Sequence, residues 1–129
     1  MKIGIIGAGK VGGALCKSLR EAGVNVVGLT AGTEADTLAA AAKFQVKGFA
    51  SNEELTANSD VLFLTVPDRL VGAVASELAQ AFSNRSGAQS LQGKTFFHCS
   101  GSLGLEELQP LAELGADIGS LHPLQSFAS

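Results

Sequence analysis

Tryptophan and tyrosine are absent from the sequence, so its large aromatic side chains are seven phenylalanines. A surface that stacks nucleic-acid bases would therefore depend on phenylalanine alone. Positive charge is also scarce, because nine Lys and Arg stand against twelve Asp and Glu, giving a formal net charge of −3. Proteins that hold nucleic acid through its phosphates need the opposite balance. Together these absences argue against nucleic acid as a partner.

Cysteine is rare, and long apolar runs are missing. Cys16 and Cys99 stand far apart, with no CxxC or zinc-type spacing. We therefore expect no metal site, and two reduced thiols in a cytoplasmic protein. No apolar run approaches the roughly 20 residues of a membrane-spanning helix, and the first residues indicate a strand and a glycine turn, not a signal peptide. The 129 residues predict one globular domain without a membrane segment.

Glycine is plentiful, and the first glycines form the most informative pattern. An apolar segment, residues 2–6, leads directly into GAGKVG at residues 7–12. This is the G-x-G-x-x-G pattern of a dinucleotide-binding βαβ unit. In such units Gly7 would allow the turn, Gly9 would let the backbone approach a pyrophosphate, and Gly12 would let the helix pack closely on the strand. The pyrophosphate would lie on free N–H groups at the helix N-terminus.

The same glycines are also compatible with a turn that binds nothing. Their context favours the ligand-binding interpretation, because Val11, Leu15 and Leu19 follow at helical spacing and a β-branched segment, residues 24–29, comes next. Strand, glycine turn, helix and second strand thus occur in the order that the motif requires.

Strands and helices alternate along the whole sequence, which predicts an α/β doubly wound Rossmann fold with a mainly parallel six-stranded sheet in the order 3-2-1-4-5-6. Strands are expected at residues 2–6, 25–29, 46–50, 61–66, 95–99 and 117–121. Helices are expected at residues 10–22 and 34–43, from 68 onward, and at 105–114, where Pro110 bends or divides the helix; residues 51–54 form a capped turn and 83–93 a surface loop.

Ligands of this fold bind beyond the carboxyl ends of the strands. After the second strand no Asp or Glu stands at the strand end to bind a ribose 2′-hydroxyl, while Thr30 and Thr33 offer hydrogen bonds to a 2′-phosphate. Glu34 fits better as a charge at a helix N-terminus. This favours NADP over NAD as the cofactor, although no Arg is present. After the fourth strand, Val66 and Pro67 are expected to form an apolar wall near the ribose and nicotinamide of the cofactor.

Polar residues also follow the fifth and sixth strands. Ser100 is a candidate to bind the nicotinamide carboxamide or a substrate oxygen, and His98 a candidate acid or base. The alternative is a hydrogen-bonded core histidine and a helix-capping serine. Cys99 has no cationic neighbour to activate it and fits a small buried residue. His122 is a candidate for a substrate pocket or an interdomain contact, or a structural turn residue.

Several segments resemble a known family: IGIIGAGKVG at residues 3–12, LTVPD at 64–68, HCSG at 98–101 and GSLHPLQSF at 119–127. They are similar to the N-terminal Rossmann-like domain of NADP-dependent oxidoreductases akin to the deazaflavin-dependent NADP oxidoreductases. Pyrroline-5-carboxylate reductase and 6-phosphogluconate dehydrogenase are more distant relatives of that family. The resemblance implies cofactor binding through Gly7, Ala8, Gly9, Lys10, Val11 and Gly12, with Val66 and Pro67 beside the cofactor.

The chain departs from the family in two respects. Thr30-Ala31-Gly32 stands where such domains often carry Ser-Arg for the 2′-phosphate, which leaves NADP against NAD open. The family continues into a helical C-terminal domain that dimerises and completes the substrate pocket, whereas this sequence stops at Ser129. The resemblance thus implies an NAD(P)-binding domain at residues 1–129, inactive alone, that belongs to an oxidoreductase and forms a homodimer.

The resulting hypothesis is hydride transfer between NADP or NAD and an unidentified small-molecule substrate. Two alternatives stay open at this point. One is a non-catalytic dinucleotide-binding or redox-sensing module, and the other is a domain for a different adenine nucleotide.

Overall fold

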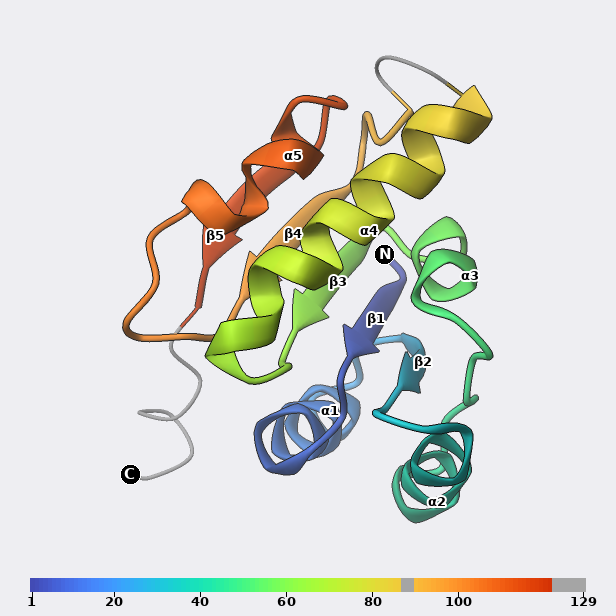
Figure 1. Ribbon diagram of the computed structural model, residues 1–129. Helices are drawn as coiled ribbons and strands as arrows, with labels where there is room; N and C mark the ends of the chain where they lie inside the picture. The colour runs from blue at the N-terminus through green and yellow to red at the C-terminus, as the bar shows by residue number, and fades with distance from the viewer. Residues whose placement is uncertain (87–89, 122–129) are drawn as a thin grey trace.

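Within the residues that the structure describes, the sheet has five parallel strands with helices on both faces (Figure 1). The computed structural model describes residues 1–86 and 90–121. The strands are β1 (Ile3–Ile6), β2 (Val26–Thr30), β3 (Val61–Leu64), β4 (Thr95–His98) and β5 (Asp117–Ser120), in the order β2-β1-β3-β4-β5. The helices are α1 (Lys10–Glu21), α2 (Glu34–Phe44), α3 (Asn52–Ala57), α4 (Asp68–Ser86), the short 3₁₀ helix η1 (Glu106–Leu108) and α5 (Gln109–Ala112).

Two apolar cores lie on opposite faces of the sheet because the central strands are apolar on both sides. β1 and β3 are buried at every position. Alternate side chains point to opposite faces, so Ile5 and Phe63 pack with α1 and α2, while Ile6 and Leu64 pack with α3, α4, η1 and α5. Figure 1 shows α4 and α5 in front of the sheet. This is the doubly wound arrangement that the alternating pattern predicts.

The third expected strand, at residues 46–50, is reduced to a single bridge between Gly48 and Leu29. The N–H of Leu29 donates to the carbonyl of Lys47 at 3.0 Å, and the N–H of Phe49 donates back to Leu29 at 2.9 Å. Helix α2 ends at Phe44, Gln45 follows it in a left-handed conformation, and Ser51 already caps α3, so little chain remains for pairing. The predicted strand order is therefore confirmed, and the predicted strand number is wrong.

Two smaller expectations also change. The loop expected at residues 83–93 begins later, because α4 continues to Ser86, and Leu91 is fully buried. The helix expected at residues 105–114 is divided as Pro110 suggested: a 3₁₀ turn precedes α5, and Pro110 lies in the first turn of α5, where a missing N–H costs no helical bond.

Two negative findings hold for residues 1–86 and 90–121. None of the helices there combines the length and the apolar character needed to cross a membrane. No three His, Cys, Asp or Glu side chains in these ranges come together as a metal-binding group.

The residue before β3 fastens the start of β1. The N–H of Lys2 donates to Oδ2 of Asp60 at 2.8 Å, and the N–H of Asp60 donates to the carbonyl of Lys2 at 2.7 Å. The backbone N–H of Lys2 lowers the pKa of Asp60, helped by the charges of Lys2, the N-terminal amine and Lys94 and opposed by desolvation. A lowered pKa in the folded state means that this carboxylate adds stability above its unfolded pKa and loses that contribution as the pH falls through the folded pKa.

We expect Asp60→Asn to lower the free energy of unfolding at pH 7, with a deficit against wild type that shrinks steadily below about pH 4. Urea unfolding followed by circular dichroism at several pH values measures this. Asp117→Asn is the matched control, since within the described ranges its carboxylate makes no hydrogen bond. An Asp60→Asn deficit of the same size at pH 7 and pH 2.5 would contradict the assignment.

Candidate functional site

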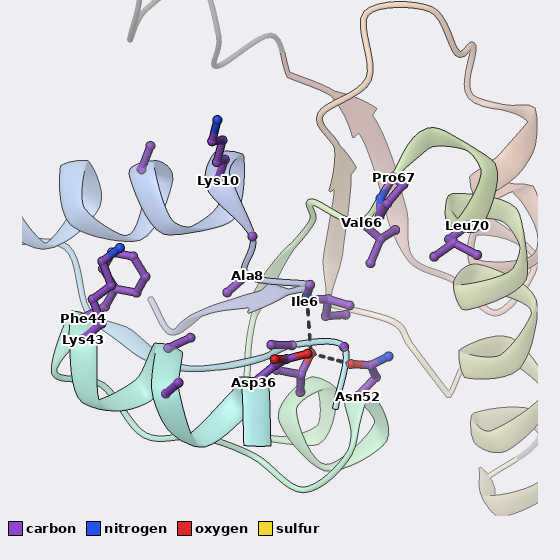
Figure 2. A pocket seen from close by; sticks show the side chains of 18 of the residues that line it. Ile6, Ala8, Lys10, Asp36, Lys43, Phe44, Asn52, Val66, Pro67 and Leu70 are labelled. Carbon is purple, nitrogen blue, oxygen red and sulfur yellow. Dashed lines mark hydrogen bonds between the residues drawn. The ribbon is translucent and has the colours of Figure 1, made fainter. Parts of the chain in front are cut away.

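A cleft of about 940 Å³ opens at the carboxyl ends of β1, β2 and β3 (Figure 2). It lies where the chain leaves β1 for α1 on one face and leaves β3 for α4 on the other, which is the switch point at which this architecture binds ligands. The turns after the three strands line it together with one side each of α1, α2 and α4 and the first residue of α3. From the predicted set it contains Gly7, Ala8, Gly9, Lys10, Thr30, Val66 and Pro67.

The three motif glycines have different surroundings. Gly7 has φ +84°, and a Cβ there would overlap the Val66 side chain. A Cβ at Gly12 would overlap the hydroxyl of Thr65 and lie 3.2 Å from the carbonyl oxygen of Gly7. A Cβ at Gly9 would meet no atom within 4 Å. The first and last glycines thus allow the turn and the close packing, whereas Gly9 faces open space on the cleft.

Thr65 holds this turn in place, a role that the sequence analysis missed. Its hydroxyl lies 3.0 Å from the carbonyl oxygen of Ile6 and 2.9 Å from that of Gly7, and its N–H donates to Ile6 at 2.8 Å. On the opposite side, the N–H groups of Gly7 and Ala8 both donate to the carbonyl of Thr30, at 3.1 and 2.8 Å. The glycine turn is therefore fastened to the ends of both neighbouring strands.

The N-terminus of α1 differs from those of α2 and α3. Thr33 and Ser51 cap α2 and α3 through side-chain hydrogen bonds, and acidic residues occupy both first turns. Helix α1 begins after Gly9, without a side-chain cap or an acidic residue. The N–H groups of Lys10, Val11 and Gly12 have no backbone acceptor within residues 1–86 and 90–121. Such a helix end attracts an anion.

Charged side chains around the cleft reinforce this preference. Lys10, Lys17 and Lys43 line it against one carboxylate, Asp36, although the whole chain has a net charge of −3. The ion pair found in the described ranges, Arg85 with Glu53, lies elsewhere. The cleft thus concentrates positive charge in an acidic protein and suits an anionic ligand.

The end of β2 brings together residues that the sequence analysis weighed and one that it did not. Thr30 lines the cleft but is buried, and its hydroxyl donates to Asn52 at 2.6 Å. Thr33 caps α2 and lines a neighbouring cavity of about 430 Å³. Asp36 extends into the cleft, with Oδ2 3.3 Å from the position of a Cβ on Gly32 (Figure 2). No signal in the sequence pointed to this position, because it depends on how α2 packs beside the end of β2.

His98 and Ser100 form a closed polar group at the end of β4. His98 is fully buried; its Nδ1 accepts from the N–H of Ser100 at 3.2 Å, so its Nε2 donates to the carbonyl of Gly104 at 2.7 Å. The Ser100 hydroxyl lies 3.2 Å from that of Ser102, which donates to Asp68 at 2.8 Å. Neither residue lines the cleft. The geometry of His98 fits the alternative of a hydrogen-bonded core histidine, whereas the Ser100 hydroxyl accepts from the N–H of Ser102 in a turn and does not cap η1 or α5. His122 lies outside the described residues.

Known proteins place this geometry in context. Solved structures share the fold. Biliverdin reductase from Synechocystis sp. PCC 6803, in complex with biliverdin and NADP⁺, is 21% identical with a TM-score of 0.66, and the match covers 97% of this chain and 39% of that one. WlbA dehydrogenase from Bordetella pertussis, in complex with NADH and UDP-GlcNAcA, is 20% identical with a TM-score of 0.68 and coverages of 94% and 37%, and 3-hydroxyisobutyrate dehydrogenase from Mycobacterium tuberculosis is 21% identical with a TM-score of 0.70 and coverages of 91% and 38%. The chain spans about two fifths of the length of these proteins.

A search among curated protein sequences finds no match. A family model described as a Rossmann-like domain matches residues 1–123, which is most of the chain. The expected fold class is thereby confirmed, and the chain belongs to the Rossmann-like domain family.

Proposed function

We propose that this chain is the NAD(P)-binding domain of an oxidoreductase that transfers hydride between a nicotinamide cofactor and a small molecule. The observation that carries the proposal is the uncapped, acid-free N-terminus of α1 beside the open position at Gly9, within a positively charged cleft at the switch point. Structures of the same fold with NADP⁺ and with NADH support it. When bound, the nicotinamide supplies the hydride chemistry, and the protein supplies binding and orientation.

The residues present fit such a cofactor. The N–H groups of Lys10, Val11 and Gly12 and the Lys10 ammonium would hold the pyrophosphate. Val66 and Pro67 would form the apolar wall beside the cofactor. Ser100, predicted as a cofactor ligand, has its hydroxyl engaged by Ser102 and would instead order the loop after β4.

Catalysis is proposed to need more polypeptide than this cleft. The solved proteins of the same fold named above are more than twice as long as this chain, and His98, the candidate acid or base, is buried outside the cleft. A helical domain that completes the substrate pocket, a homodimer and a cytoplasmic location stay predictions of the sequence. By itself the chain is expected to bind cofactor without turnover.

Calorimetric titration with NADH and NADPH tests the proposal, with two matched glycine variants. Gly9→Ala places a methyl group in the space that faces the cleft, so we expect cofactor affinity to fall about tenfold while stability changes by less than about 1 kcal/mol. Gly12→Ala makes the same chemical change against Thr65 and should lower the free energy of unfolding by about 1–3 kcal/mol. A weak Kd would be on the order of 100 µM. Absence of binding heat with both cofactors, at protein concentrations above that value, would overturn the proposal.

Asp36 supports NAD over NADP within this proposal. Its carboxylate lies beside Gly32 at the end of β2, where this fold places the adenosine ribose, and no described cation pairs with it. A carboxylate there accepts from a ribose 2′-hydroxyl and repels a 2′-phosphate. This reverses the preference for NADP that the missing strand-end acid suggested.

We expect wild type to bind NADH more tightly than NADPH, and Asp36→Asn to narrow that ratio by about tenfold or more because the repulsion is removed. Competition titrations with both cofactors measure the ratio. Glu34→Gln is the control, since it removes the same charge from the same helical turn but lines the neighbouring cavity instead. An unchanged ratio in Asp36→Asn would exclude Asp36 as the selectivity residue.

A thiol-based redox sensor, which differs from the dinucleotide-binding or redox-sensing module considered from the sequence, is disfavoured by both cysteines. Such a sensor needs an accessible thiolate. Burial raises the pKa of the half-buried Cys99 to about 11. Cys16 is fully buried, and burial also raises its pKa, against a smaller opposing effect of Arg20.

We expect iodoacetamide to alkylate Cys99 roughly 100-fold or more slowly at pH 7.5 than it alkylates an unfolded peptide, because the thiolate fraction scales with the pKa difference. Mass spectrometry of the digested protein separates the two thiols, and a synthetic peptide of residues 97–100 is the reference. The Cys99 rate should rise up to about pH 11. A midpoint near pH 8.5 in folded protein, checked by circular dichroism, would contradict the burial of this thiol and support a thiol-based sensor.

A further inference from the structure

Asn52 lies at a corner of the cleft where three elements meet. It is the first residue of α3, directly after the Ser51 cap, and it faces the ends of β2 and the first turns of α4. Its Oδ1 lies 2.6 Å from the hydroxyl oxygen of Thr30. The Thr30 hydroxyl in turn lies 3.4 Å from the N–H of Gly7. The buried hydroxyl of Thr30 therefore holds the Asn52 side chain in place through this hydrogen bond.

The Thr30 contact decides which way the carboxamide faces. Hydroxyl-to-oxygen hydrogen bonds are typically about 2.7 Å long, whereas amide nitrogens lie about 2.9 Å or more from an acceptor. The Thr30 hydroxyl donates to Oδ1 of Asn52 at 2.6 Å, a separation that matches a hydroxyl-to-oxygen bond. The reverse orientation would also leave the Thr30 proton without this acceptor.

The nitrogen of the Asn52 carboxamide then faces the cleft. Within the described part of the chain Nδ2 has no hydrogen-bond partner, and Figure 2 shows it turned away from the Thr30 bond. The other side of the cleft carries Val66, Leu70 and Val74, and Leu70 is 39% exposed. One fixed hydrogen-bond donor thus stands in a cleft whose other wall is apolar.

We propose that Asn52 recognises the purine base of the bound nucleotide by donating from Nδ2 to a ring nitrogen of the base. A purine combines flat apolar faces, suited to the Val66, Leu70 and Val74 wall, with ring nitrogens that accept hydrogen bonds. Thr30 acts as a positioning residue that keeps Nδ2 of Asn52 directed into the cleft. This inference rests on the proposed nucleotide binding and adds a residue that selects the base.

The test combines changes in the protein with changes in the ligand. Calorimetry measures the binding of ADP, of its 1-deaza, 3-deaza and 7-deaza analogues, and of inorganic pyrophosphate, which has no base. In wild type, the loss of one particular ring nitrogen should weaken binding about three- to tenfold, as expected for one hydrogen bond. In Asn52→Ala, the affinity for ADP should fall by a similar factor. The same analogue should then bind this variant as tightly as ADP does, and pyrophosphate should bind as in wild type.

Asn52→Asp protects the test against a folding defect, because it keeps an acceptor for Thr30 and replaces the donor by a second acceptor. It should weaken ADP about tenfold or more, and it should weaken pyrophosphate by a smaller factor, because the added carboxylate repels any phosphate in the cleft. A parallel loss of ADP and pyrophosphate in the uncharged variant Asn52→Ala would show that Asn52 only supports the glycine turn, and the proposal would be overturned. The same conclusion follows if no deaza analogue differs between wild type and Asn52→Ala. Wild-type protein that binds neither pyrophosphate, ADP nor NADH would instead overturn the proposed function itself.

Discussion

The close contact between the glycine turn and the end of β3 is the constraint on which the rest of the site depends. Thr65 bonds to the carbonyl groups of Ile6 and Gly7, and only a residue without a Cβ fits between Thr65 and the Gly7 carbonyl at position 12. That contact sets the direction in which α1 leaves the sheet. It also turns the first N–H groups of α1 toward the cleft and leaves Gly9 facing open space.

The two halves of the cleft follow from this placement. On the α1 and α2 side, backbone N–H groups and lysines favour negative charge, modulated by the one carboxylate of Asp36. On the α4 side, Val66, Pro67, Leu70 and Val74 are apolar. Beyond them, the His98, Ser100 and Ser102 group ties the loop after β4 to Asp68 at the start of α4. Its hydrogen bonds are satisfied internally, which suits a rigid support for the cleft more than a group that exchanges protons.

The sequence was sufficient wherever a local pattern determined the structure. The glycine spacing, the alternating elements and the fully apolar β3 predicted the strand order and the position of the cleft. It was insufficient where distant residues decide. Residues 46–50 look like a strand, but the end of α2 at Phe44 and the Ser51 cap leave room for one bridge. Thr65, Asp36 and Asn52 were missed because their roles depend on contacts between separate elements, which spacing does not reveal.

The reduced pairing at Gly48 also bears on how readily the β2 edge of the sheet could pair with another chain. A parallel sheet whose outermost strand is long and flat offers its free backbone groups to other molecules. Here the outer side of β2 is occupied by a segment that pairs at a single residue, lies between two helices, and exposes Lys47 over the ring of Phe49 at 4.8 Å. A short, charged and bent border of this kind gives a neighbouring chain no template for strand addition.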